Sequence, residues 1–338
     1  MGKIYNSITE LVGHTPIVEF KRLEEKLGLK GRIAGKLEYF NPAGSHKDRM
    51  ALEIIEAAEA RGDISPDKTT LVEFTSGNTG IALAAFAAAK GYKFKIGLQN
   101  GVSAERLKLL QAYQAEIADV PQELIAGVFE KGIAAFADVI DYMEKDVENA
   151  YATRQLDNPD NINAHYTHTG PEIWDDTDGK VDIFVGGVGT GGSTHGVSQY
   201  LKEKNPNIKV IITQPDPNDV VNPIIKGAED GGFHGIHQVH NDDGITPLAP
   251  ANFSDELTDE YNFISYAETL RAIHLLAKYE GIFVGASAGA SLAVAIKQAL
   301  KDENAGKLIV PLLPDNGERY LSEDLQLVRP EVEENVGF

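Results

Sequence analysis

The feature that most constrains the fold is a repeated alternation of short apolar strands and helical segments, joined by glycine-containing turns. Residues 70–74 are typical of a buried strand and residues 81–90 of an alanine-rich helix, and residues 94–98 predict the next strand. The turn at 75–80 (Thr-Ser-Gly-Asn-Thr-Gly) joins the first strand to the helix. This β-α-β-α order is typical of a parallel sheet with helices on its faces.

The same order returns in the second half of the chain, which begins near Gln155. Residues 181–185 predict a strand, residues 186–192 a glycine loop, residues 194–203 a helix and residues 208–213 another strand. We therefore expect an α/β protein with two halves.

Three further segments make specific predictions. Residues 48–61 and residues 124–143 each predict one helix, because apolar residues recur at helical spacing. Residues 308–313 predict a last strand, and Pro311 within it indicates an edge strand or a bulge.

Composition narrows the class of partner. The 338 residues are 42% hydrophobic and 24% charged, as in soluble globular proteins. A net charge of −20 argues against nucleic acid or an anionic membrane as partner. The absence of cysteine excludes disulfides and a cysteine nucleophile, and it suits the cytoplasm, where we expect the protein.

One lysine has a setting suited to covalent chemistry. Lys47 lies in the turn Asn41–Arg49 (Asn-Pro-Ala-Gly-Ser-His-Lys-Asp-Arg), just before the predicted helix. Partial desolvation at such a junction favours the neutral amine, which is the form that makes a Schiff base. An isolated lysine near a helix start would more often be an ordinary surface residue.

Two turns that end in helices can bind anions. The turn at 75–80 suits a carboxylate, and the loop at 187–193 offers backbone N–H groups and two hydroxyls to a phosphate. The same loop also matches the dinucleotide pattern Gly-x-Gly-x-x-Gly, which leaves an NAD-dependent oxidoreductase as an alternative. Such an enzyme is expected to have an acidic residue at the end of the next strand to bind the ribose hydroxyl, where this chain has Gln214.

These motifs, in this order, resemble the cysteine synthase (O-acetylserine sulfhydrylase) and cystathionine beta-synthase family, pyridoxal-phosphate enzymes of fold type II. The segments 285–289 (Gly-Ala-Ser-Ala-Gly) and 314–320 (Pro-Asp-Asn-Gly-Glu-Arg-Tyr) add to the resemblance. It implies two three-layer α/β/α domains with mainly parallel sheets. We divide the chain into a smaller domain (1–12 and 36–153), a larger domain (13–35 and 154–327) and an acidic tail (328–338).

The resemblance also implies roles for single residues. Lys47 would bind the cofactor aldehyde and later move the substrate Cα proton. Asn78 would contact the ring 3′ oxygen, and Ser287 the pyridine nitrogen, unless Ser287 only caps the following helix. The substrate carboxylate would be bound by Thr75, Ser76, Gly77, Thr79 and Gln155. The phosphate would be bound by Gly189, Thr190, Gly191, Gly192 and Ser193.

The segment 239–245 departs from the family pattern, because it replaces a glycine-rich loop near the substrate. His240, Asp242 or Asp243 could act on the incoming group there. His234, His237 and His240 do not have a spacing that suits one helix face, so we expect no metal site.

We therefore expect a β-replacement enzyme that uses pyridoxal phosphate to make cysteine from O-acetylserine and sulfide. Cystathionine formation and sulfide release from cysteine are alternatives, as is a non-catalytic amino-acid-binding paralogue. We also expect a homodimer, and the resemblance suggests serine acetyltransferase as a partner.

Overall fold

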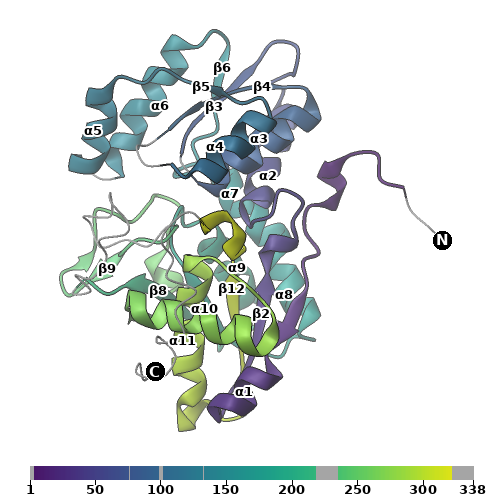
Figure 1. Ribbon diagram of the computed structural model, residues 1–338, viewed down its shortest axis with the longest axis vertical. Coiled ribbons are helices and arrows are strands. Elements are labelled where there is room, and N and C mark those ends of the chain that lie inside the picture. The colour runs from purple at the N-terminus through teal and green to yellow at the C-terminus, as the bar shows by residue number, and fades with distance from the viewer. Residues whose placement is uncertain (1–3, 76, 99–101, 132, 218–234, 322–338) are drawn as a thin grey trace.

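The structure, a computed structural model, describes residues 4–75, 77–98, 102–131, 133–217 and 235–321. Its two larger sheets are separate, and each is covered by helices on both faces (Figure 1). The observed fold is α/β with mainly parallel sheets, which confirms the predicted fold class.

The smaller sheet has strand order β5-β4-β3-β6, and all of its strand pairs are parallel. Its strands are β3 (Thr70–Phe74), β4 (Lys93–Gly97), β5 (Glu116–Ile117) and β6 (Ala150–Ala152). Its helices are α2 (Lys47–Arg61), α3 (Asn78–Lys90), α4 (Ala104–Ala112), α5 (Gln122–Lys131) and α6 (Ala134–Asp146). The predicted strand at 70–74 is confirmed to the residue.

The larger sheet has strand order β1-β2-β12-β7-β8-β11, and only the pair β1–β2 is antiparallel. Its strands are β1 (Ile17–Glu19), β2 (Arg32–Leu37), β7 (Val181–Gly187), β8 (Lys209–Pro215), β11 (Glu260–Ile264) and β12 (Leu308–Leu313). Its helices are α1 (Lys21–Leu27), α7 (Pro159–Ala164), α8 (Gly170–Asp176), α9 (Gly192–Lys204), α10 (Tyr266–Glu280) and α11 (Ala286–Leu300). The boundary that we predict at 35/36 falls inside β2.

Short elements complete the described chain. They are the 3-10 helices at Ile8–Leu11, Glu38–Phe40, Asp255–Leu257, Asp302–Asn304 and Gly317–Tyr320, a π-helix at His165–Thr169, and a hairpin of β9 (His240–Asn241) and β10 (Gly244–Ile245). None of the described helices is both long and apolar enough to cross a membrane.

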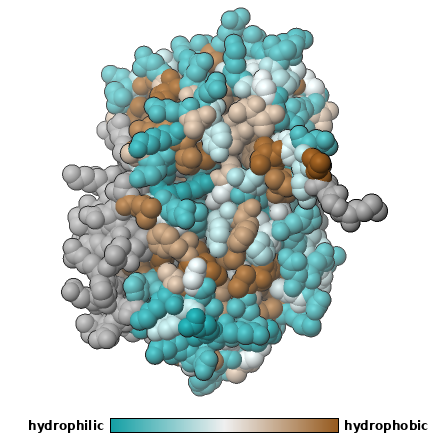
Figure 2. All heavy atoms as spheres, turned by 45° about the vertical axis from the view of Figure 1, so that its right-hand side comes forward, coloured by the Kyte–Doolittle hydropathy of each residue, from teal (hydrophilic) through white to brown (hydrophobic). Residues whose placement is uncertain are grey.

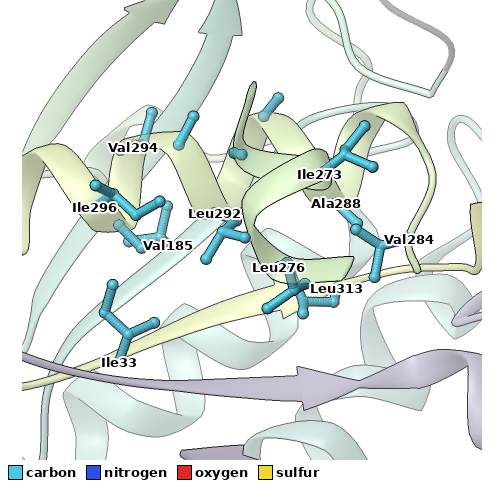
Figure 3. Close-up of a cluster of buried hydrophobic side chains, with 14 of the residues drawn as sticks. Ile33, Val185, Ile273, Leu276, Val284, Ala288, Leu292, Val294, Ile296 and Leu313 are labelled. Atoms are coloured by element: carbon cyan, nitrogen blue, oxygen red, sulfur yellow. The ribbon is translucent and has the colours of Figure 1, made fainter. Parts of the chain in front are cut away.

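Alternation along the strands divides the core of the larger sheet into two layers. Ile183 and Val185 of β7 pack with α10 and α11, whereas Phe184 packs with Val197 of α9. Figure 3 shows the first layer, where Leu292 of α11 lies among side chains of the strands and of α10. Burying a side chain of this size contributes about 1.5–3 kcal/mol, so this layer fixes α11 on the sheet.

Two predictions about these elements are wrong. Residues 124–143 form parts of two helices, because α5 ends at Lys131 and α6 begins at Ala134. The sequence has Gly132 at the junction, and glycine disfavours a helix interior by about 1 kcal/mol.

For Pro311 we expected an edge strand or a bulge, and only the edge position is wrong. Its strand, β12, lies between β2 and β7 in the middle of the sheet. The register shifts between Leu308 and Ile309, and the pairing with β2 skips from Ile309 to Leu312. A central strand tolerates a proline where a rung of the ladder is absent, since proline has no N–H to donate.

Candidate active site

Lys47 is the first residue of α2, whereas we expected the helix to begin one residue later, at position 48. Its Nζ lies 3.0 Å from Oγ1 of Thr190 in the glycine loop. The side chain is half-buried, and burial lowers the pKa of the Lys47 amine to about 8. At neutral pH a useful fraction of this amine is therefore unprotonated.

Backbone contacts fix the turn that carries Lys47. The N–H of His46 donates to the Pro314 carbonyl at 2.9 Å, and the N–H of Lys47 donates to Oγ of Ser45 at 3.2 Å. The Asp48 carboxylate accepts from the N–H of Ala43 at 2.5 Å. Burial raises the pKa of Asp48 to about 7.

A buried group of ion pairs holds the next turn of α2, and we call it the charge cluster: Lys36, Glu38, Arg49 and Glu172. Nε of Arg49 lies 2.7 Å from Oε2 of Glu38, and its Nη2 lies 2.7 Å from Oε2 of Glu172. Lys36, which has no exposed side-chain surface, donates to Glu172 at 2.8 Å. The cluster ties α2 to β2 and α8, which belong to the larger sheet.

Charge pairing controls the ionisation of Glu172. Burial alone would raise its pKa, but the hydrogen bond and charge of Arg49, followed by Lys36, outweigh burial and lower the pKa to about 2. The carboxylate therefore stays ionised across the physiological range.

The turn at 75–80 joins β3 to α3, as the sequence predicts. Thr75 and Thr79 are buried, and the N–H of Gly77 donates to Oγ1 of Thr75 at 3.3 Å. Oγ1 of Thr79 donates to Oε1 of Gln155 at 2.5 Å. Ser76 lies outside the described residues. Two of the residues expected to bind the substrate carboxylate, Thr79 and Gln155, are thus in direct contact.

The glycine loop lies at the N-terminus of α9 and is tightly packed. A Cβ on Gly192 would lie 2.1 Å from Oδ1 of Asn161, and one on Gly189 would lie 2.4 Å from the Gly235 carbonyl oxygen. Gly191 has a φ of 83°, which favours glycine. The loop needs its glycines because the Asn161 side chain and the Gly235 backbone approach it closely. Ser193 is buried in the first turn of α9.

Asn161 connects the two turns, and the sequence reasoning missed it. Its Nδ2 donates to Oγ1 of Thr190 at 3.0 Å and to the Gln155 carbonyl at 2.8 Å. The only sequence signal was its position six residues after Gln155. We call the connected set Thr79, Gln155, Asn161, Thr190 and Lys47 the hydroxyl–amide chain.

The last two predicted cofactor residues lie at element ends. Asn78 is the first residue of α3, and its amide contacts Asp315 and Arg319, which the sequence reasoning did not single out as site residues. Ser287 is the second residue of α11 and is buried. The helix begins at Ala286 with Gly285 as its N-cap, so the alternative that Ser287 caps the helix is wrong.

The segment 239–245 forms the β9–β10 hairpin. Gln214 at the end of β8 accepts from the N–H groups of Val239 and His240, each at 3.2 Å. The His240 ring stacks on Tyr261 with 4.3 Å between ring centroids, and Asp242 and Asp243 are exposed. Within the described residues, no three histidine or acidic side chains gather as a metal site would need, and His234 lies outside them.

Both flanks of this hairpin pack on the glycine loop. The N–H of His237 donates to the Val188 carbonyl at 2.8 Å. On the other flank, a Cβ on Gly191 would lie 2.7 Å from the N atom of Phe253. The hairpin is therefore anchored to the loop that is expected to bind phosphate.

These residues fit pyridoxal phosphate. Lys47 supplies an amine with a lowered pKa, and its neighbour Thr190 belongs to a loop whose backbone N–H groups begin a 13-residue helix. A helix N-terminus of this kind binds a phosphate group well.

Comparison with known proteins identifies the family. The family model described as "Pyridoxal-phosphate dependent enzyme" matches residues 8–315. This chain belongs to that family. The protein is therefore an enzyme that depends on pyridoxal phosphate, and the alternative of an NAD-dependent oxidoreductase is wrong.

Individual relatives cover nearly the whole chain. Cysteine synthase A of Escherichia coli strain K12 is 40% identical over 325 residues, covering 95% of each protein. Cysteine synthase 3 of Caenorhabditis elegans is 38% identical over 318 residues, covering 94% of this chain and 88% of that protein. The resemblance seen in the motifs is confirmed.

Solved structures agree. A cysteine synthase from Entamoeba histolytica superposes with a TM-score of 0.81 at 36% identity, covering 97% of this chain and 92% of that one. O-ureido-L-serine synthase superposes with a TM-score of 0.79 at 34% identity, covering 96% of this chain and 95% of that one. A hydrogen sulfide-producing enzyme from Fusobacterium nucleatum superposes with a TM-score of 0.79 at 33% identity, covering 95% of this chain and 99% of that one.

Proposed function

We propose that this enzyme is a cysteine synthase, which converts O-acetylserine and sulfide to cysteine and acetate. The observation that carries the proposal is the hydroxyl–amide chain. It brings the Lys47 amine, the glycine loop and the turn at 75–80 into one connected site. The similarity to cysteine synthases along nearly the whole chain supports the same reaction.

When bound, pyridoxal phosphate supplies an electron sink that allows a Cα proton and a β-substituent to leave. In the reaction the Cβ–O bond to acetate breaks and a Cβ–S bond to sulfide forms. We assign to Lys47 the removal of the Cα proton and its return. Its lowered pKa suits it to both directions, since a proton-transfer group works best near its own pKa.

The two turns would hold the two anionic ends. Thr75, Gly77 and Thr79, together with Gln155, would bind the substrate carboxylate, and Ser76 is proposed with them from the sequence. The loop Gly189–Ser193 would bind the phosphate at the start of α9. Both turns begin helices, where unpaired N–H groups favour anions.

Ser287 would face the pyridine nitrogen. Its hydroxyl lies beside the glycine-loop flank, with Oγ 3.7 Å from the position of a Cβ on Gly235. A neutral hydroxyl cannot keep the ring protonated as a carboxylate would, so the electron sink is weaker. A weaker sink favours prompt loss of the β-substituent over return of the proton.

We assign choice of the incoming nucleophile to the hairpin of His240, Asp242 and Asp243. Its flanks are anchored to the glycine loop, and its polar side chains are absent from the glycine-rich loop expected in the family. The names of two structural neighbours, O-ureido-L-serine synthase and a hydrogen sulfide-producing enzyme, give products other than cysteine for similar folds, which supports a variable choice of reactant.

The test is spectroscopic and kinetic. With cofactor, we expect an absorption band at about 410–420 nm, as a protonated Schiff base to Lys47 requires. O-acetylserine should shift the band, and sulfide should then yield cysteine. Lys47→Ala should abolish the band and lower turnover by about 10²–10⁴-fold. Lys180→Ala, at an exposed ion pair with Asp178, is the matched control.

Other donors sharpen the assignment. Serine, O-phosphoserine and cysteine should each turn over more slowly than O-acetylserine. A faster rate with one of them would replace the proposed substrate, and no turnover with any would reject the function.

Two structural expectations also stay proposals. The division into two domains is supported by the separate sheets, with β1 and β2 in the larger one. A homodimer is supported by exposed apolar side chains near the N-terminus, where Ile4 is 93% exposed and Ile8 and Leu11 are also exposed. Figure 2 shows apolar side chains at the surface beside the grey N-terminal residues. Ile4→Asp with Ile8→Asp should then lower the mass measured by light scattering. The cytoplasmic location and the serine acetyltransferase partner stay predictions.

A further inference from the structure

The segment 314–320, which follows β12, contacts three parts of the proposed cofactor site: the Lys47 turn, the start of α3 and the start of α11. Asp315 pairs with Ser45 in an isolated backbone bridge, beside the bond from His46 to the Pro314 carbonyl. The N–H of Gly285, which caps α11, donates to the Asp315 carbonyl at 3.2 Å. The segment thus joins the Lys47 turn to the start of α11.

Two side chains of this segment hold the Asn78 amide from both ends. Nδ2 of Asn78 donates to Oδ2 of Asp315 at 2.6 Å, and Oδ1 of Asn78 accepts from Nη1 of Arg319 at 2.6 Å. A guanidinium only donates hydrogen bonds, and an ionised carboxylate only accepts them. The pair therefore fixes which end of the amide is oxygen and which is nitrogen.

Arg319 and Asp315 are themselves held. Arg319 also donates to the Ala43 carbonyl in the Lys47 turn. Oδ2 of Asp315 also accepts from the Tyr320 hydroxyl, and the residue is only 1% exposed. Oδ1 of Asp315 is buried and has no hydrogen-bond partner among the described residues. A carboxylate oxygen in that state is costly to keep, which argues that Asp315 does more than fill space.

We propose that Asp315 and Arg319 are positioning residues that hold Asn78 so that it can only donate a hydrogen bond from Nδ2 to the cofactor. This inference rests on the proposed function, in which Asn78 contacts the ring 3′ oxygen. With one Nδ2 hydrogen bound by Asp315, the other is left for that oxygen. A fixed donor favours the oxygen in its deprotonated form, and this form gives the long-wavelength absorption band.

The test compares three variants of the full-length protein with bound pyridoxal phosphate. Asp315→Asn removes the charge of the side chain and allows the Asn78 amide to flip, so that its oxygen and nitrogen exchange places. Tyr320→Phe removes the hydroxyl that donates the second hydrogen bond to Asp315. Glu318→Gln makes the same acid-to-amide change at an exposed position of the same segment.

For Asp315→Asn, we expect the cofactor dissociation constant to rise by about 10- to 100-fold, which corresponds to losing one hydrogen bond to a charged group. We also expect part of the long-wavelength band to move to shorter wavelength. Glu318→Gln and Tyr320→Phe should keep the parent spectrum and bind within about threefold. Urea unfolding of each cofactor-free variant separates a general loss of stability from a loss of cofactor binding.

The inference is overturned if Asp315→Asn keeps the parent spectrum and affinity. It is also overturned if Tyr320→Phe changes the spectrum and the affinity as much as Asp315→Asn does. These readouts do not depend on the substrate. A parent protein that binds the cofactor but does not turn over O-acetylserine would reject the proposed function and leave the role of Asp315 standing.

Discussion

Two groups of polar side chains meet the start of α2, and they differ in charge. The charge cluster surrounds Arg49 and matches each buried cation with carboxylates. The hydroxyl–amide chain reaches Lys47, whose amine contacts the neutral hydroxyl of Thr190. The two groups lie only two residues apart along the helix.

The difference matches the structural role that we assign to Lys36 and the chemical role that we propose for Lys47. Lys36 lies between Glu172 and the Thr15 carbonyl, at 2.8 and 2.7 Å, and we assign it to holding the fold. Lys47 is desolvated by its surroundings, which lowers its pKa to about 8. The neutral partner of Lys47 thus supports the covalent role that we propose for it.

The largest expected effect comes from breaking the charge cluster. Arg49→Met leaves Glu38 buried with an unpaired charge, so the free energy of unfolding should fall by about 3–5 kcal/mol. Urea denaturation would measure it. Arg61→Met is the matched control, because its ion pairs with Asp63 and Asp160 are half-exposed and should be worth about 0–1 kcal/mol. Equal losses in the two variants would contradict the comparison.

The two lysines should respond oppositely to the same substitution. At pH 7, Lys36→Met should destabilise the cofactor-free protein, whereas Lys47→Met should stabilise it. Because Lys47 has a folded pKa of about 8, below its unfolded value, the unfolded chain binds the extra proton between pH 8 and about 10.5.

Stability of the parent should therefore rise with pH across that window, by at most about 1.4 kcal/mol per pH unit for this one group. Lys47→Met should lack this rise, so its advantage over the parent should vanish by about pH 10.5. Urea unfolding of the parent and of Lys47→Met at several pH values would measure this difference in stability. A difference that does not change with pH would count against a lowered pKa of Lys47.

The smallest effect should come from the hydroxyl–amide chain. Thr190→Val removes the partner of Lys47 and one of the two partners of Nδ2 of Asn161, and should cost about 1–2 kcal/mol. Thr167→Val, at an exposed hydroxyl bonded to the Asn163 carbonyl, should change stability by less than about 0.5 kcal/mol. Thermal unfolding compares them, and a larger effect at Thr167 would refute the assignment.

Local sequence signals predicted most elements because they depend on near neighbours. Thr70–Phe74 is a strand because its run of apolar residues is bounded by turns, and α3 follows because alanine favours a helix. The glycine loop was recognisable because its glycines are spaced within seven residues. The break between α5 and α6 was missed because apolar periodicity continues across it.

The sequence by itself determined the two-part α/β fold and pointed to the proposed Schiff-base lysine and the two turns proposed to bind anions, since each is written in a contiguous stretch. Only the tertiary structure decided that Arg49 pairs with Glu172, that Asn161 joins Thr190 to Gln155, and that Asp315 holds Asn78. These partners are up to 237 residues apart along the chain. Contacts of that range depend on how the sheets and helices pack, which no local pattern records.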